Sequence, residues 1–143
     1  MVLKRARWLL GMLLIGASAG ATEEGPANNV IEFKMHMRGS KGIVRCGLFE
    51  RSGWLEQVVK PATAKIRDGY ALCVFPRIRP GTYGISAFHD ENENGKLDTN
   101  FVGMPTEDYC ASRNARGVLG PPSFEDAKFQ YKGGIRRLEA RMK

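Results

Sequence analysis

Polar and apolar residues alternate along much of the chain after residue 29. In residues 30–38 the apolar members occupy every second position, the period-two pattern of a strand that buries one face. Similar short apolar segments cover residues 43–50, 62–66, 70–75 and 82–89, and most are bounded by proline or glycine. No long helical period follows residue 29, so the pattern predicts an all-β fold.

A glycine-containing turn at residues 39–42 predicts a hairpin between the first two strands. A symmetric hairpin places Met35 opposite Cys46 and Phe33 opposite Leu48, so that apolar side chains meet. We therefore expect these two strands to be hydrogen-bonded neighbours.

A second hairpin is expected at Gly133 and Gly134, near the end of the chain. It places Phe129 opposite Leu138 on one face, with Lys128 and Glu139 forming a complementary pair on the other. With the strands between the two hairpins, the pattern predicts a seven-stranded antiparallel β-sandwich.

The N-terminus has the features of a secretory signal peptide. Three basic residues precede the apolar segment 8–15, and small residues follow at 17–19. The apolar segment is too short to span a membrane. We expect residues 1–21 to be a signal peptide cleaved after Ala19 or Ala21, residues 22–28 a short leader, and residues 29–143 a single β-sandwich domain. The protein is then exported, periplasmic or extracellular, with no membrane span in the mature chain.

Composition narrows the function classes further. A chain of 143 residues provides one domain. Removing the signal peptide leaves 19 basic and 15 acidic residues, so the net charge falls from +7 to +4. This small excess argues against a nucleic-acid partner, and export excludes chemistry that depends on cytosolic ATP or NAD.

Residues 90–100 are rich in oxygen-bearing side chains and contain one glycine at residue 95. The spacing matches positions 1, 3, 5, 6 and 9 of an EF-hand loop, where alternate side chains converge on Ca²⁺ and the glycine at position 6 permits the sharp turn; the next residue gives only its carbonyl. The expected ligands are Asp90, Asn92, Asn94, the Lys96 carbonyl and Asp98. Phe101 stands where the bidentate glutamate belongs, so the expected calcium site is weak. The alternative is a metal-free turn with side-chain-to-backbone hydrogen bonds.

Several segments together resemble one bacterial family. They are residues 80–83 (Pro-Gly-Thr-Tyr), 87–92 (Ala-Phe-His-Asp-Glu-Asn), 94–100 (Asn-Gly-Lys-Leu-Asp-Thr-Asn), 103–105 (Gly-Met-Pro) and 120–127 (Gly-Pro-Pro-Ser-Phe-Glu-Asp-Ala). The chain resembles the bacterial domain of unknown function 2141 family, most strongly over residues 80–129. The resemblance implies a small exported β-sandwich similar to transthyretin-like and carboxypeptidase-regulatory-like modules, and it implies no activity. The expected fold is a β-sandwich of transthyretin-like or immunoglobulin-like type.

The chain has three cysteines. Cys46 and Cys73 fall in predicted strands, and an exported protein folds in an oxidising compartment, so we expect them to form a disulfide. The alternative is two buried thiols, since Cys110 leaves an odd number.

The polar stretch after residue 103 is the expected binding region. We expect the 90–100 loop, residues 104–115 and the turn at 120–126 to gather at one end of the sandwich, as loops of this fold do. Phe101 and Met104 should pack there. Tyr109 as a stacking surface, with Arg113 and Asn114 as hydrogen-bonding groups, suits an envelope carbohydrate or peptide.

These features predict an exported binding or accessory module of the bacterial cell envelope rather than an enzyme. No serine lies in a nucleophile elbow. One alternative is a carboxylate-dependent hydrolase that uses Glu107 and Glu125. The other is a purely structural envelope protein.

Overall fold

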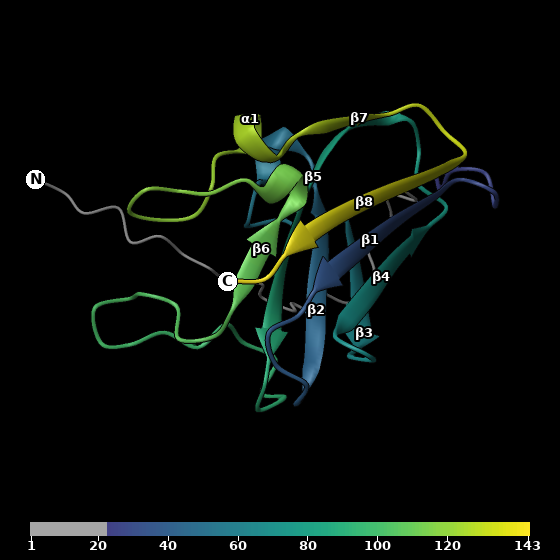
Figure 1. Cartoon of the computed structure of the whole chain (residues 1–143). Helices are drawn as coiled ribbons and strands as arrows, with labels where there is room; N and C mark the ends of the chain where they lie inside the picture. Colours follow the sequence, from purple (N-terminus) through teal and green to yellow (C-terminus); the bar gives the residue numbers. More distant parts are fainter. Residues whose placement is uncertain (1–22) are drawn as a thin grey trace, which may run out of the picture.

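The computed structural model describes residues 23–143, so the expected signal peptide lies outside the described residues. Most of the regular structure is β, arranged in two sheets (Figure 1). The strands are β1 (Val30–His36), β2 (Ile43–Phe49), β3 (Lys60–Lys65), β4 (Tyr70–Pro76), β5 (Gly81–Asp90), β6 (Tyr109–Ala111), β7 (Phe129–Tyr131) and β8 (Ile135–Arg141). The helical turns are η1 (Arg51–Gly53), η2 (Ser112–Asn114) and α1 (Phe124–Ala127).

The smaller sheet has three strands in the order β4-β1-β8. β1 pairs antiparallel with β4, which places Phe33 beside Cys73. On its other side β1 pairs parallel with β8, which places Phe33 beside Leu138. The alternation expected for residues 30–38 is present, because Ile31, Phe33 and Met35 are fully buried while their neighbours are not.

The larger sheet has the order β3-β2-β5-β6, and the short strand β7 also pairs with β5. β5 is its longest strand and is buried from Tyr83 to Asp90. β6 lies at one edge of this sheet and pairs only with the middle of β5, from Ser86 to Phe88. It is flanked on both sides by long connections, which Figure 1 shows projecting from the same side of the molecule.

The two sheets enclose one main hydrophobic core. Side chains from both sheets contribute to it, including Phe33 and Phe75 from the smaller sheet and Leu48 and Ile85 from the larger one. Cys46 on β2 and Cys73 on β4, the pair expected to bridge, are joined by a disulfide with an S–S distance of 2.11 Å. This bond connects the two sheets covalently. Cys110 on β6 is a free, buried thiol.

Both expected hairpins are wrong. β1 and β2 belong to different sheets, so residues 37–42 carry the chain from one sheet to the other. The turn at Gly133 and Gly134 likewise connects β7 in the larger sheet to β8 in the smaller one. Alternation shows which face of a strand is buried, but it does not show which strand is its hydrogen-bonded partner. Apolar side chains also meet when two strands face each other across a core, so the matching of apolar residues did not distinguish the two arrangements.

The strand count and direction also differ from expectation. Residues 23–143 contain eight strands, because Tyr109–Ala111 forms an additional short one, and the β1–β8 pairing is parallel. The transthyretin-like or immunoglobulin-like type stays a prediction. The expected leader packs on the strands from residue 23 onward, where Gly25 donates a backbone hydrogen bond to Arg77. Within residues 23–143, no helix is long and apolar enough to cross a membrane.

Candidate functional site

The candidate site is the sheet edge formed by β6 and its two flanking loops. The first loop, residues 91–108, joins β5 to β6, and the second, residues 115–123, joins η2 to α1. Since β6 has three residues, the bases of the loops are separated by roughly 10 Å of strand. The loops therefore flank β6 at one edge of the larger sheet, and they project from the same side of the molecule (Figure 1).

The first loop is anchored on Asp90, the last residue of β5. Its side chain is fully buried, and its carboxylate accepts backbone hydrogen bonds from Asn94 at 3.1 Å and Gly95 at 2.9 Å. Arg45 on β2 donates from Nε to the same carboxylate at 2.6 Å. Gly95 has a φ of +80°, which a side chain would strain, and this lets the chain turn around Asp90.

Glu107 closes the same loop from its far end. Its carboxylate accepts the backbone N–H of Glu91 at 3.1 Å and that of Asp98 at 3.0 Å. The side chain is mostly buried, and this desolvation raises the pKa of Glu107 above its usual value. The two ends of the loop are thereby held together.

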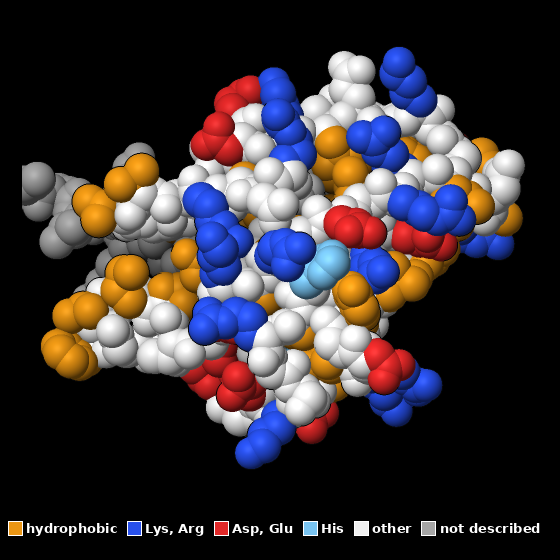
Figure 2. Space-filling view, in the orientation of Figure 1, with side chains coloured by type: hydrophobic (Ala, Val, Ile, Leu, Met, Phe, Trp, Pro, Cys, Tyr) orange, Lys and Arg blue, Asp and Glu red, His pale blue; other side chains and the backbone are white. Residues whose placement is uncertain are grey.

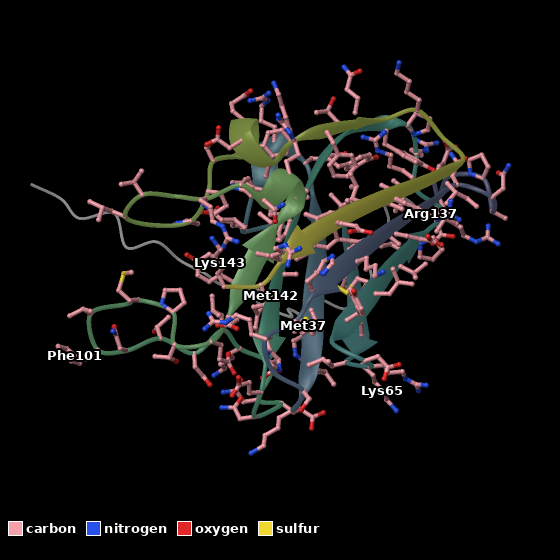
Figure 3. The ribbon with its side chains drawn as sticks, in the orientation of Figure 1. Met37, Lys65, Phe101, Arg137, Met142 and Lys143 are labelled. Carbon is pink, nitrogen blue, oxygen red and sulfur yellow. A yellow bond between two sulfur atoms is a disulfide. The ribbon has the colours of Figure 1, made fainter. Side chains whose placement is uncertain are left out.

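The far half of the first loop is a tight turn with an apolar end. The Asn100 side-chain oxygen accepts backbone hydrogen bonds from Val102 and Met104, at 3.1 and 3.0 Å, and the Asn100 N–H donates to the Met104 carbonyl. Phe101 is 101% exposed, Val102 65% and Met104 52%. Figure 3 shows the Phe101 side chain at the outer end of the loop. The expectation that Phe101 and Met104 pack against the fold is wrong.

The second loop also ends in exposed apolar side chains. Val118 is 97% exposed and Leu119 93%. A Cβ on Gly117 would lie 1.9 Å from the Gly120 carbonyl oxygen, so the turn requires glycine at this position. The loop returns to the fold at Pro122, whose carbonyl accepts a hydrogen bond from Trp54 Nε1 at 2.8 Å.

Comparison with known proteins identifies a family. A family model described as "Uncharacterized protein conserved in bacteria (DUF2141)" matches residues 35–138. The chain belongs to this family. The match covers every strand of this DUF2141 protein at least in part, as well as both loops, and it confirms the resemblance seen in the sequence. No significant match was found among curated proteins or among solved structures.

The acidic loop of this DUF2141 protein does not provide a set of ligands that fits Ca²⁺. Both oxygens of Asp98 accept hydrogen bonds from side-chain amides, those of Asn92 at 2.6 Å and Asn94 at 2.8 Å. The Asn94 oxygen accepts the backbone N–H of Lys96 at 2.9 Å. Over residues 23–143, no three His, Cys, Asp or Glu side chains gather where they could hold a metal ion.

A protein cation stands in the loop instead. The Arg45 guanidinium neutralises Asp90, the expected first ligand, and its Nη2 lies 3.9 Å from where a Cβ of Gly95 would be. Calcium binding would place a divalent ion beside this fixed positive charge. The hydrogen bonds are those of the metal-free turn, with Arg45 as an additional partner.

The three residues expected to form a polar cleft occupy structural positions. Arg113 and Asn114 lie in η2 with φ values of 60° and 50°. Asn114 accepts the Arg141 backbone N–H at 2.9 Å, and Arg113 donates to the Lys128 carbonyl at 3.5 Å. Tyr109 lies on β6, and its backbone is hydrogen-bonded to that of Lys143. These contacts attach η2 and β6 to the C-terminal segment.

Glu107 and Glu125, the residues named for the hydrolase alternative, are not brought together. Glu107 binds the backbone beside the end of β5, at Glu91, whereas α1, which carries Glu125, is connected through Ser112 to Ile85. Six residues of extended strand span roughly 20 Å. Carboxylates that act as a hydrolytic pair lie about 5 to 9.5 Å apart.

Basic side chains lie close to the two loops. Arg113 lies in η2 just before the second loop, and Arg116 is near the start of that loop. Lys143 lies between the two loops (Figures 1 and 3). None of these three forms an ion pair with another residue of the described part of the chain. Neighbouring acidic groups are partly neutralised, since Asp108 lies 3.7 Å from Arg38. Figure 2 shows basic side chains on the body of the molecule near the bases of the two loops, with the apolar ends of the loops farther out.

Sequence reasoning missed this apolar edge, although its signal was present. Residues 99–106 and 117–122 contain no charged residue, in a chain in which 26% of residues are charged. Five large apolar side chains occur in these two segments, between glycines and prolines. Apolar residues in turns without alternation do not belong to a strand face, so their exposure is the natural consequence.

Proposed function

We propose that this protein is an exported β-sandwich binding module of the bacterial cell envelope, and that it binds through the two loops flanking β6. The observation that carries the proposal is the exposure of five large apolar side chains on these loops. Leaving that surface in water is unfavourable, by about 25 cal/mol per Å². Large apolar side chains exposed on one side of a molecule are typical of an interaction site.

The rest of the molecule is a rigid scaffold that holds the two loops in position, which supports this proposal. The disulfide joins the sheets, and Asp90 and Glu107 brace the first loop from inside. Binding residues are commonly placed on loops that such a scaffold holds in position. The proposal assigns no catalytic residue, and the carboxylate-dependent hydrolase is the weaker candidate because its two glutamates lie far apart.

The first experiment tests export. The full chain is expressed in a Gram-negative host, and the mass of the protein in the periplasmic fraction is measured. We expect a protein that begins after Ala19 or Ala21. Recovery of the uncleaved chain in the cytoplasm would overturn the assignment to the envelope.

The second experiment tests binding at the loops. The purified protein is mixed with isolated peptidoglycan, with lipopolysaccharide and with inner-membrane vesicles, and the bound fraction is measured. Phe101→Ser with Leu119→Ser should lower the bound fraction on the preferred component. The matched control, Leu72→Ser with Ile135→Ser, removes exposed apolar side chains of β4 and β8 and should not. If the parent protein binds none of the three components, the protein is structural and the proposal fails.

A further inference from the structure

The apolar ends of the two loops differ from an ordinary protein-binding patch in shape. Phe101, Val118 and Leu119 are each more than nine-tenths exposed, so they stand at convex tips and not in a concave or flat surface. The two tips belong to separate loops that project from the same side of the molecule (Figures 1 and 2). A partner must therefore surround each tip, and it must accept both at once.

The tips are held in this exposed position by the chain itself. Asn100 accepts two backbone hydrogen bonds across the first tip, and Gly117 and Gly120 approach each other closely below the second. The first tip is thus hydrogen-bonded and the second tightly closed, so the backbone of the two loops loses little conformational freedom when the side chains are buried. A partner gains their apolar surface without having to reorganise the loops.

A lipid bilayer is the partner that matches these properties. Its interface is fluid and closes around a protruding side chain, whereas a folded protein would need two matching cavities. Apolar side chains beside basic residues favour shallow insertion into a membrane surface, with affinity that depends on apolar area and anionic lipid. The uncharged segments 99–106 and 117–122 can enter this interface without burying a charge.

The basic residues lie where phosphate groups would meet the protein. Arg113, Arg116 and Lys143 are close to the loops and have no acidic partner within residues 23–143. Each basic residue near an anionic membrane adds electrostatic attraction to it. Two acidic residues of the loop base have cationic partners, since Asp90 pairs with Arg45 and Asp108 with Arg38. The Glu107 carboxylate accepts two backbone hydrogen bonds instead.

We propose that residues 101–104 and 118–119 insert into the surface of an anionic phospholipid bilayer, with Arg113, Arg116 and Lys143 contacting its phosphate groups. This inference rests on the proposed function and names the envelope component that the loops bind. The chain then docks on the membrane through its loop ends, and the outer face of the smaller sheet stays free.

The test uses protein purified after expression of the full chain, with its mass measured so that all variants share one N-terminus. Sedimentation with vesicles of phosphatidylethanolamine and phosphatidylglycerol gives the partition constant. Phe101→Ser with Leu119→Ser should lower this constant at least tenfold. The control pair Leu72→Ser with Ile135→Ser should leave it within twofold of the parent value, and melting curves verify that both variants are folded.

Two further measurements examine the mode of contact. Vesicles without phosphatidylglycerol, or 0.5 M salt, should lower the partition constant at least tenfold, because charge attraction is lost. Phe101→Trp keeps an apolar ring and adds a fluorophore. Its emission should shift to the blue on anionic vesicles and be quenched by lipids brominated near the headgroup end of the acyl chain.

The outcomes separate this inference from the proposed function. Absence of parent binding to both vesicle types overturns the membrane contact. If peptidoglycan or lipopolysaccharide is still bound through the loops, the proposed function holds and only the membrane contact is excluded. Equal binding by the loop variant and the control variant also overturns it. So does a concentration-dependent dimer that the loop variant abolishes in the absence of vesicle binding, because a second copy then covers the tips.

Discussion

Arg45 should be among the most important polar residues for stability, because it is the cationic partner of a fully buried carboxylate. The Arg45→Met variant keeps much of the apolar length of the side chain and removes its charge. Asp90 then remains buried, with 0% of its side chain exposed, and loses the donor at 2.6 Å. An uncompensated charge in the interior is the cause of the expected loss.

The size of the effect follows from the geometry. Removing one partner of a buried ion pair costs about 3 to 5 kcal/mol. Asp90 keeps the backbone hydrogen bonds from Asn94 and Gly95, which favours the lower end, about 3 kcal/mol. At roughly 4 °C per kcal/mol for a domain of this size, the melting temperature should fall by about 12 °C.

The matched control is Arg137→Met. Arg137 also contacts a carboxylate, that of Glu32 at 2.9 Å, but its side chain is 72% exposed. An exposed pair contributes about 0 to 1 kcal/mol, so the control should melt within about 4 °C of the parent. Arg45→Met combined with Asp90→Asn should be more stable than Arg45→Met alone, because the buried charge is gone.

The assay is urea unfolding followed by circular dichroism, with melting curves as a second measure. Free energies of unfolding are compared between variants that have the same m-value, because a changed m-value indicates a change in the unfolded state. If Arg45→Met and Arg137→Met lose the same stability, the guanidinium is not the partner that Asp90 needs. In that case the account of the loop given above is refuted.

Four other predictions follow from the described contacts. Millimolar calcium should leave the melting temperature of the parent protein unchanged relative to chelator, because the side-chain oxygens of the 90–100 loop already accept hydrogen bonds. A rise in the melting temperature would show that the loop rearranges into a metal site. Thiol titration of the denatured protein should find one thiol before reduction and three after it, and three thiols before reduction would contradict the disulfide. Cys46→Ala with Cys73→Ala should lower the free energy of unfolding by about 2 to 4 kcal/mol. The Cys110 thiol, whose pKa burial raises to about 12, should react with maleimide only after unfolding; rapid labelling of the native protein would show that β6 opens. Ser112→Ala should cost about 1 to 3 kcal/mol in urea unfolding, because the buried Ser112 hydroxyl bonds the Ala127 carbonyl at 2.6 Å and accepts the Ile85 N–H at 2.9 Å; an unchanged midpoint would exclude that role.

The positions of most strands could be predicted from the sequence, but their partners could not. The predicted strand at 70–75 corresponds to β4, and that at 82–89 to β5, because alternation records which side chains meet the core. Pairing depends on which strands lie side by side after the chain crosses between sheets, and alternation contains no record of this. Lys128 illustrates the point, since it pairs with Glu125 rather than with Glu139.

Only part of the candidate site could be predicted from the sequence, because a local pattern does not record contacts with distant strands. The importance of the 90–100 loop was visible from its spacing, and the residues that turn around Asp90 are those that the spacing singled out. Arg45, on a strand 45 positions earlier, supplies the cation, and no local pattern identifies it. The exposure of Phe101 was missed because an apolar residue in a loop was assumed to pack.

The parallel pairing of β1 with β8 has a consequence for the order of events during synthesis. β1 is the middle strand of its sheet, and Val30 pairs with Ile135, so this sheet is complete only when residues 135–141 have been made. Pairing over such sequence separation makes folding slow. A chain that is exported through a narrow channel must remain unfolded until it has passed. By placing β8 beside β1 at the edge of the smaller sheet, this topology delays completion of the sheet until residues 135–141 have been made, which suits the proposed export.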